Sequence, residues 1–202
     1  ALMLWVAGPD QVLAESPALR VGVVGTPPAT LSPYGLHLAE EIQLAEALFA
    51  SLVEAGPDGT LQAALATAWR QEADGRGWIL TLREDRHWND GSPMTLEQVR
   101  RGLARHFPDA RIRATGPDQL SLDFPSPQPT LAEMLASGRR GLAHPDDDAR
   151  AVPRGSGPYL LRERDSARWA LVANPHYQGT QARPFETIEL HFDSAHARLP
   201  RL

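Results

Sequence analysis

The stretch TLQAALATAWRQEADGRGWILTLREDRHWNDGSPMTLEQVRRGLAR, from Thr60 to Arg105, decides the fold of this chain. Its first turn, Asp74-Gly75, lies between the segments WRQE and WILTL. An Asp-Gly pair between two such runs predicts a β-hairpin, because glycine adopts the positive φ that a tight turn needs. We therefore expect one strand over residues 69–72 and its partner over residues 78–82.

A second turn, Asp90-Gly91, comes before a helix in the same stretch. Thr95 with Gln98 three residues later is a capping box, in which each side chain bonds a backbone N–H at the start of a helix. Val99 and Leu103 follow at the spacing of one helical face. The pattern predicts an amphipathic helix that begins after Thr95.

Three tryptophans, Trp69, Trp78 and Trp88, belong to the same stretch. Trp78 alternates with Leu80 and Leu82, which places three apolar side chains on one face of a half-buried strand. Large aromatic side chains at alternating positions are usually core residues. We therefore expect the tryptophans to stabilise the fold and not to contact a ligand.

Outside this stretch, strand and helix patterns follow one another in the manner of a mixed α/β chain. Residues 19–24 are β-branched and predict a strand, which Pro27 and Pro28 end. Residues 37–53 show the period of an amphipathic helix. The other elements that we expect are strands over residues 111–115, 120–124, 159–164, 169–173 and 187–192 and a short helix over residues 130–135.

The composition is that of an ordinary globular protein and excludes several kinds of chemistry. Of the 202 residues, 42% are hydrophobic and 22% are charged, which suffices for a buried core. The net charge of −5 gives no indication of nucleic-acid binding at the level of the whole chain, because such proteins usually carry a basic surface. Cysteine is absent, and the 20 basic residues counted as Lys+Arg are all arginine. A disulfide, a thiolate nucleophile and a Schiff-base lysine are therefore excluded, and no run reaches the roughly 20 apolar residues that span a bilayer.

The remaining polar clusters do not form the motif of an enzyme or a metal site. The seven histidines are scattered, and no pair has the spacing typical of zinc ligands. Glu40-Glu41 falls on the expected helix and residues 146–148, all aspartate, in a loop, so we expect both acidic groups to be solvated. Gly155-Ser156-Gly157 is not the Gly-x-Ser-x-Gly of a nucleophile elbow. We therefore predict no enzyme activity, no metal ion and no cofactor.

Several motifs in order resemble the bacterial extracellular solute-binding proteins of family 5, the oligopeptide, dipeptide and nickel class. The longest motif of that family has the form dG…P.LA..W…dG..w.F.LR..v.W.dG.p.T..dV..s..R. The residues that match it are Asp58-Gly59, Leu65-Ala66, Trp69, Asp74-Gly75, Trp78, Leu82-Arg83, Trp88, Asp90-Gly91, Pro93, Thr95, Val99 and Arg105. Further matches are Leu31-Ser32-Pro33, Phe49–Val53, Gly155–Tyr159 and Asn174–Tyr177. The resemblance covers most of the chain.

The resemblance implies a fold class: an α/β lobe of the periplasmic-binding-protein type II fold, with a mixed sheet and a smaller inserted α+β domain. We expect the main α/β domain over residues 19–54 and 151–202 and the inserted domain over residues 55–150. Residues 1–18 are either the remnant of a secretory signal or a linker. In the family the chain continues into a second lobe, and we expect that lobe to be absent here.

The resemblance also implies the positions that bind ligand. In the family, the segment after the Leu-Ser-Pro motif faces the ligand cleft, which carries over to Tyr34, Gly35, Leu36 and His37. Tyr159, at the end of the Gly-Ser-Gly-Pro-Tyr motif, is the fifth candidate. The alternative is that both tyrosines are structural and pack without touching a ligand.

The function that the resemblance implies is that of a solute-binding component of an ABC importer. Its partners would be a peptide or similar small solute, permease subunits at the membrane and the second lobe, with no nucleic acid in this segment. A periplasmic location follows, and the absence of cysteine favours a free protein over a lipoprotein. Two alternatives stay open: the solute-sensing region of a transcription regulator with an upstream helix-turn-helix domain, and a truncated lobe without ligand.

Overall fold

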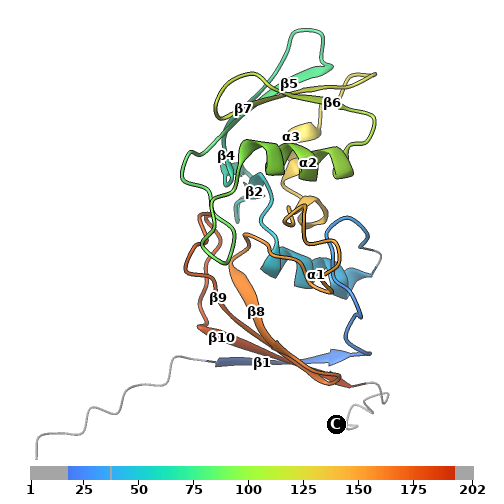
Figure 1. Cartoon of the computed structure of the whole chain (residues 1–202), viewed down its shortest axis with the longest axis vertical. Helices are drawn as coiled ribbons and strands as arrows, with labels where there is room; N and C mark the ends of the chain where they lie inside the picture. Colours follow the sequence, from blue (N-terminus) through green and yellow to red (C-terminus); the bar gives the residue numbers. More distant parts are fainter. Residues whose placement is uncertain (1–17, 37, 194–202) are drawn as a thin grey trace, which may run out of the picture.

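The computed structural model describes residues 18–36 and 38–193, which form two large sheets with helices between them (Figure 1). The elements in chain order are β1 (Ala18–Val24), α1 (Ala39–Leu48), β2 (Val53–Ala55), β3 (Leu61–Ala63), β4 (Ala66–Gln71), β5 (Gly77–Leu82), α2 (Leu96–His106), β6 (Arg111–Ala114), β7 (Gln119–Asp123), α3 (Leu131–Leu135), the 3₁₀ turn η1 (Gly138–Arg140), β8 (Tyr159–Arg164), β9 (Arg168–Ala173) and β10 (Thr187–Asp193). In the part of the chain that the structure describes, no helix is long and apolar enough to cross a membrane.

The first sheet has the strand order β1-β10-β9-β8 and is mixed. β1 runs parallel to β10, with Val23 opposite Phe192, and the other neighbours are antiparallel. Asp165 closes the β8–β9 hairpin, because its carboxylate accepts hydrogen bonds from the backbone N–H groups of Ala167 and Arg168 at 2.8 and 2.7 Å. The predicted strands of this region are confirmed. Since β1 and β10 are parallel, their carboxyl ends lie at the same edge of the sheet.

The second sheet has the strand order β4-β5-β7-β6 and is antiparallel. The predicted turn at Asp74-Gly75 joins β4 to β5, with φ at Gly75 of 73°. The carboxylate of Asp74 accepts hydrogen bonds from the backbone N–H groups of Arg76 and Gly77 at 2.9 and 3.2 Å. The predicted hairpin over residues 111–124 is confirmed as β6 and β7. The short β2–β3 ladder was not predicted.

Helix α2 begins as the capping box predicts. The Thr95 hydroxyl accepts a hydrogen bond from the backbone N–H of Gln98 at 3.2 Å, and the Gln98 side-chain oxygen accepts one from the N–H of Thr95 at 2.9 Å. That same oxygen also accepts a hydrogen bond from the indole N–H of Trp88 at 3.1 Å. Val99 and Leu103 on the helix are fully buried. The cap therefore fixes both the start of the helix and the tryptophan beneath it.

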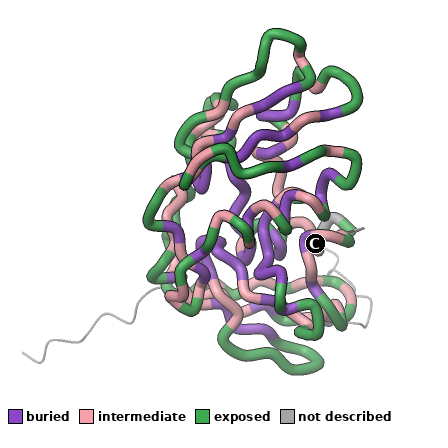
Figure 2. Tube along the Cα trace, turned by 45° about the horizontal axis from the view of Figure 1, so that its top comes forward, coloured by how far each residue is buried: buried purple, intermediate pink, exposed green. Residues whose placement is uncertain are grey.

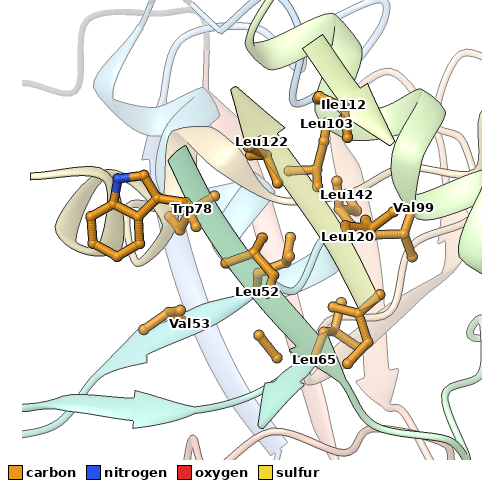
Figure 3. Packing of buried hydrophobic residues seen from close by; sticks show 14 of the residues in the cluster. Leu52, Val53, Leu65, Trp78, Val99, Leu103, Ile112, Leu120, Leu122 and Leu142 are labelled. Atoms are coloured by element: carbon orange, nitrogen blue, oxygen red, sulfur yellow. The ribbon is translucent and has the colours of Figure 1, made fainter. Parts of the chain in front are cut away.

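The buried apolar side chains of the described residues form two clusters. The larger one lies between the second sheet and α2 and includes Leu52, Leu65, Trp78, Val99 and Leu120 (Figure 3). The smaller one lies between the first sheet and α1. The buried positions run through the middle of the molecule and the exposed ones follow the outer loops (Figure 2). We name these clusters the large core and the small core.

All three tryptophans of the Thr60–Arg105 stretch contribute to the large core, as predicted. Trp88 is fully buried, and Trp78 is buried with its indole N–H donating to the Gln128 carbonyl at 3.0 Å. Trp69 packs against this core with part of its ring exposed.

Helix α1 ends at Leu48, so the prediction of a helix through Val53 is wrong. The backbone N–H of Gly157 donates to the Leu48 carbonyl at 3.0 Å. A Cβ on Gly155 would lie 2.0 Å from the Leu48 oxygen, and one on Gly157 would lie 2.5 Å from the Leu48 carbonyl carbon. The segment around Gly157, distant in sequence, therefore hydrogen-bonds the last carbonyl of the helix. Both glycines are needed because a side chain would prevent this close approach.

Candidate functional site

A hollow lies at the edge of the first sheet where β1 and β10 both end. Its volume is about 470 Å³, which is in the range typical of small-molecule sites. The residues that line it are Val23, Val24, Gly25, Thr26, Pro27, Pro28, Ala29, Leu38, Glu40, Glu41, Leu44 and Phe192. In open α/β sheets, ligands bind in crevices outside the carboxyl ends of the strands. We name this feature the strand-end hollow.

The loop after β1 forms one wall of the strand-end hollow. Gly25 has φ 122°, a conformation that side chains disfavour, and it turns the chain out of the strand. Pro27 and Pro28 follow, and neither has a backbone N–H that could continue the ladder. The loop is therefore held away from the sheet, which keeps the hollow open.

Two exposed apolar side chains mark the strand-end hollow as a surface that is suited to being covered. Val24 is 71% exposed and Leu38 is 53% exposed, and they are the exposed large hydrophobic residues among those that the structure describes. Both line the hollow. Apolar side chains gathered in a concave place are typical of binding sites.

The start of α1 forms the opposite wall and is acidic. Leu38 occupies the N-cap position, and its backbone N–H donates to the Glu41 carboxylate at 3.1 Å. Glu40 and Glu41 both lie in the first turn of the helix. Carboxylates there are favourable because they oppose the partial positive charge of a helix N-terminus. One orphan N–H of the helix start is thus already satisfied within the chain.

The structure places Tyr34 away from the strand-end hollow. Its hydroxyl donates to the Ala143 carbonyl at 3.1 Å and accepts from the Ala143 N–H at 3.3 Å. Its ring centroid lies 4.8 Å from that of His106, and the Arg105 guanidinium lies 5.0 Å from the ring. Burial raises the pKa of Tyr34. The side chain therefore ties the loop before α1 to α2 and to the segment after η1.

The other predicted ligand positions are dispersed. Gly35 is exposed, and Leu36 packs half-buried against the small core. His37 lies outside the described residues. Tyr159 is buried in the small core, and its hydroxyl donates to the Phe185 carbonyl at 3.1 Å. None of the described positions lines the strand-end hollow, and their ligand-binding role stays a prediction.

Away from the strand-end hollow, a cluster of charged side chains around Arg154 lies between the large core and the small core. The Arg154 guanidinium donates to Asp147 at 2.8 Å through Nε and to Asp90 at 2.8 Å through Nη1. The backbone N–H of His144 donates to the Arg154 carbonyl at 2.8 Å. The expectation that residues 146–148 are all solvated is wrong for Asp147, which is 5% exposed. Its charge is buried because Arg154 neutralises it.

The pKa shifts in this cluster follow from the same contacts. Hydrogen bonds from Arg154 lower the pKa of Asp147 to about 2. Burial raises the pKa of Asp90, but bonds from Ser92 and Arg154 outweigh it and the pKa falls. Hydrogen bonds from Asp147 and Asp90 raise the pKa of Arg154. All three groups are therefore charged at neutral pH, and the cluster is a structural ion-pair network.

Within residues 18–36 and 38–193, no group of three or more histidine, aspartate or glutamate side chains is placed to hold a metal ion. The strand-end hollow offers apolar contact, with carboxylates among the residues that line it.

Two residues of the strand-end hollow carried a signal in the sequence that was missed. Val24 shares the outward face of β1 with Arg20 and Gly22, where an apolar residue is unexpected. Leu38 stands at a helix N-cap, where serine, threonine, aspartate or asparagine is preferred. Apolar residues at positions that suit polar ones indicate a covered surface.

A mixed α/β sheet with a ligand-sized hollow at its carboxyl edge, followed by a second sheet inserted between β1 and β10, defines the class of periplasmic binding proteins. The comparisons with known proteins agree. The family model described as "Bacterial extracellular solute-binding proteins, family 5 Middle" matches residues 60–201. The chain belongs to this family, and the predicted fold class is confirmed.

The relatives match over part of their length. The probable D,D-dipeptide-binding periplasmic protein DdpA of Escherichia coli is 30% identical over 142 residues, which cover 58% of this chain and 27% of that protein. A putative binding protein of Haemophilus influenzae is 39% identical over 188 residues, covering 79% of this chain and 36% of that protein. A solved structure, an ABC transporter substrate-binding protein from Sinorhizobium meliloti, is similar with a TM-score of 0.75 and 23% identity over 88% of this chain and 39% of that one. The chain thus spans about a third of the length of these relatives.

Proposed function

We propose that this chain is part of the solute-binding component of an ABC importer that works outside the cytoplasm. Its relatives are named as periplasmic and dipeptide-binding proteins, and a structural neighbour is an ABC transporter substrate-binding protein. Its mechanism is reversible binding of a peptide or similar small solute, without catalysis. A second lobe closes over the solute, and membrane permeases receive it.

The observation that carries the proposal is the strand-end hollow. Val24 and Leu38 expose apolar surface there, at the edge where two parallel strands end. A solute that covers these side chains would remove roughly 100 Å² of apolar surface from water, which at about 25 cal/mol per Å² favours binding by about 2–3 kcal/mol. Such a gain corresponds to a dissociation constant weaker than about 1 mM for this half-site alone. Useful affinity therefore needs contacts from both lobes.

The test compares the 202-residue chain with a two-lobed protein in which a second lobe follows β10. Calorimetry with a panel of dipeptides and tripeptides should give micromolar binding for the two-lobed protein and binding at least about a hundredfold weaker for the chain alone. In the two-lobed protein, a double variant Val24→Ser and Leu38→Ser should weaken binding about tenfold. The matched control is Ala114→Ser, an exposed change on β6 in the other sheet, which should have no effect.

Three results would count against the proposal. Equal affinity of the chain and the two-lobed protein would show that no second lobe is needed. Unchanged affinity in the double variant would move the site away from the strand-end hollow. A tenfold loss with His37→Ala, without any loss in the double variant, would move the site to the predicted loop.

A further inference from the structure

The charged residues that line the strand-end hollow are acidic; beyond the lining, Arg164 donates to the carbonyl of Ala29 at 3.5 Å. The hollow's described lining residues include Glu40 and Glu41 and no arginine or histidine. Glu40 is exposed, and no hydrogen bond or ion pair joins its side chain to another described residue. Apolar walls with a carboxylate at the rim suit a solute of the opposite charge.

The wall formed by the start of α1 carries two charges of opposite sign, the partial positive charge of the helix N-terminus and the negative charge of Glu40. Their relative size decides which sign of charge the wall attracts. The N-terminus of α1 carries about half a positive elementary charge, which by itself attracts an anion. Glu40 alone places a full negative charge in the first turn of the same helix. The carboxylate is therefore the larger of the two, and the wall is net negative.

The hydrogen bonds at the helix start act in the same direction. The N–H of Leu38 already donates to Glu41 at 3.1 Å, and the N–H of Ile42 already donates to the Leu38 carbonyl at 3.2 Å. A solute carboxylate would have to compete with Glu41 for the first of these donors and approach Glu40 as well. Both costs are absent for an ammonium group.

We infer that the strand-end hollow selects a solute with an apolar body and a positively charged amino group, and that Glu40 is the specificity-determining residue. The inference rests on the proposed function and adds the charge class of the solute to it. The apolar body lies on Val24 and Leu38, and the ammonium group lies at the rim beside Glu40. An exposed carboxylate contributes a modest preference, of the size of an exposed ion pair.

The test uses three probes with one apolar body and three charges: leucinamide, which is a cation at neutral pH, N-acetylleucinamide, which is neutral, and N-acetylleucine, which is an anion. The 202-residue chain, labelled with ¹⁵N, is titrated with each probe at millimolar concentration and low salt. The amide signals of Val24, Gly25 and Leu38 report the hollow. We expect leucinamide to bind about threefold more tightly than N-acetylleucinamide and more tightly still than N-acetylleucine.

A variant pair isolates the role of Glu40. In Glu40→Gln the preference for leucinamide over N-acetylleucinamide should disappear, while N-acetylleucinamide binds as before. The matched control is Glu84→Gln, an exposed glutamate outside the hollow, which should keep the preference. About 0.5 M salt should reduce the preference in the unmodified chain, because salt screens exposed charges.

The outcomes separate this inference from the proposed function. Equal binding of the three probes, a reversed order, or an unchanged preference in Glu40→Gln would overturn the charge selectivity and leave the hollow as a site. Absence of any shift at Val24, Gly25 and Leu38 with all three probes would overturn the inference, while the calorimetry on the two-lobed protein would still decide the proposed function. Shifts of the same amides on dilution without a probe would assign the hollow to contact between two copies of the chain, and would also overturn the inference.

Discussion

The large core and the strand-end hollow differ in how completely their apolar side chains are buried. In the large core, Trp88, Leu103 and Leu120 are fully buried, and the indole N–H of Trp88 donates to the Gln98 side-chain oxygen. At the strand-end hollow, Val24 and Leu38 expose most or half of their surface and the loop beside them is bent away from the sheet. Stability is therefore concentrated in the large core, while the strand-end hollow leaves apolar surface exposed.

This difference also explains why the core was easier to predict than the site. Local chemistry determines the hairpin at Asp74-Gly75 and the cap at Thr95, so both could be predicted from a few neighbouring residues. The candidate site depends on β1 meeting β10, which are separated by most of the chain, and on a loop whose neighbours are not adjacent in sequence. Periodicity contains no information on such distant pairing.

The strongest way to break the comparison is to remove a tryptophan from the large core. Trp88→Ala should lower the free energy of unfolding by about 4 kcal/mol, because it deletes a fully buried indole and leaves a cavity. Denaturant unfolding followed by circular dichroism measures the loss. In the same assay Val24→Ser should change stability by less than about 0.5 kcal/mol, because Val24 is mostly exposed. Similar losses in both variants would show that the two regions do not differ in the way we describe.

The ion-pair network between the cores should have the next largest effect. Arg154→Met should destabilise the chain by about 3 kcal/mol, because it leaves the buried Asp147 carboxylate without its main partner. Arg150→Met is the matched control: Arg150 is 61% exposed and lies 3.5 Å from the same carboxylate, so its loss should cost under about 1 kcal/mol. Equal effects of the two substitutions in urea unfolding would contradict the central role of Arg154.

The same network makes stability depend on acid. The pKa of Asp147 in the folded chain is about 2, below its ordinary value of 3.8, so the folded state binds protons less readily than the unfolded state. The stabilisation is fully present above about pH 4 and is lost as the pH falls toward 2, by up to about 2 kcal/mol. Urea unfolding at several pH values should show the loss, and Asp147→Asn should flatten it. A variant as sensitive to acid as the unmodified chain would assign the effect to other carboxylates.

How far the sequence could predict the site is shown by Tyr34 and α1. Tyr34 follows a recognisable motif, but its hydroxyl bonds Ala143, and no local pattern indicates that contact. The end of α1 at Leu48 likewise depends on Gly157, which lies far along the chain. In both cases the decisive partner is distant in sequence. At Leu38, in contrast, the unusual feature is local: the structure places a leucine at the N-cap of α1, where a polar residue is preferred.

The smallest expected effect, that of Leu38→Ser, distinguishes the core from the hollow most clearly, because stability should rise while solute binding falls. Leu38→Ser supplies a hydroxyl at the N-cap of α1, where Glu41 already accepts the backbone N–H of residue 38, so the capping box becomes complete. We expect the free energy of unfolding to rise by about 0.5–1 kcal/mol. Solute binding by the two-lobed protein should weaken at the same time, because an apolar wall of the strand-end hollow is lost. Unfolding and calorimetry on this one variant measure both effects, and a loss of stability together with unchanged binding would show that Leu38 serves the fold and not the solute.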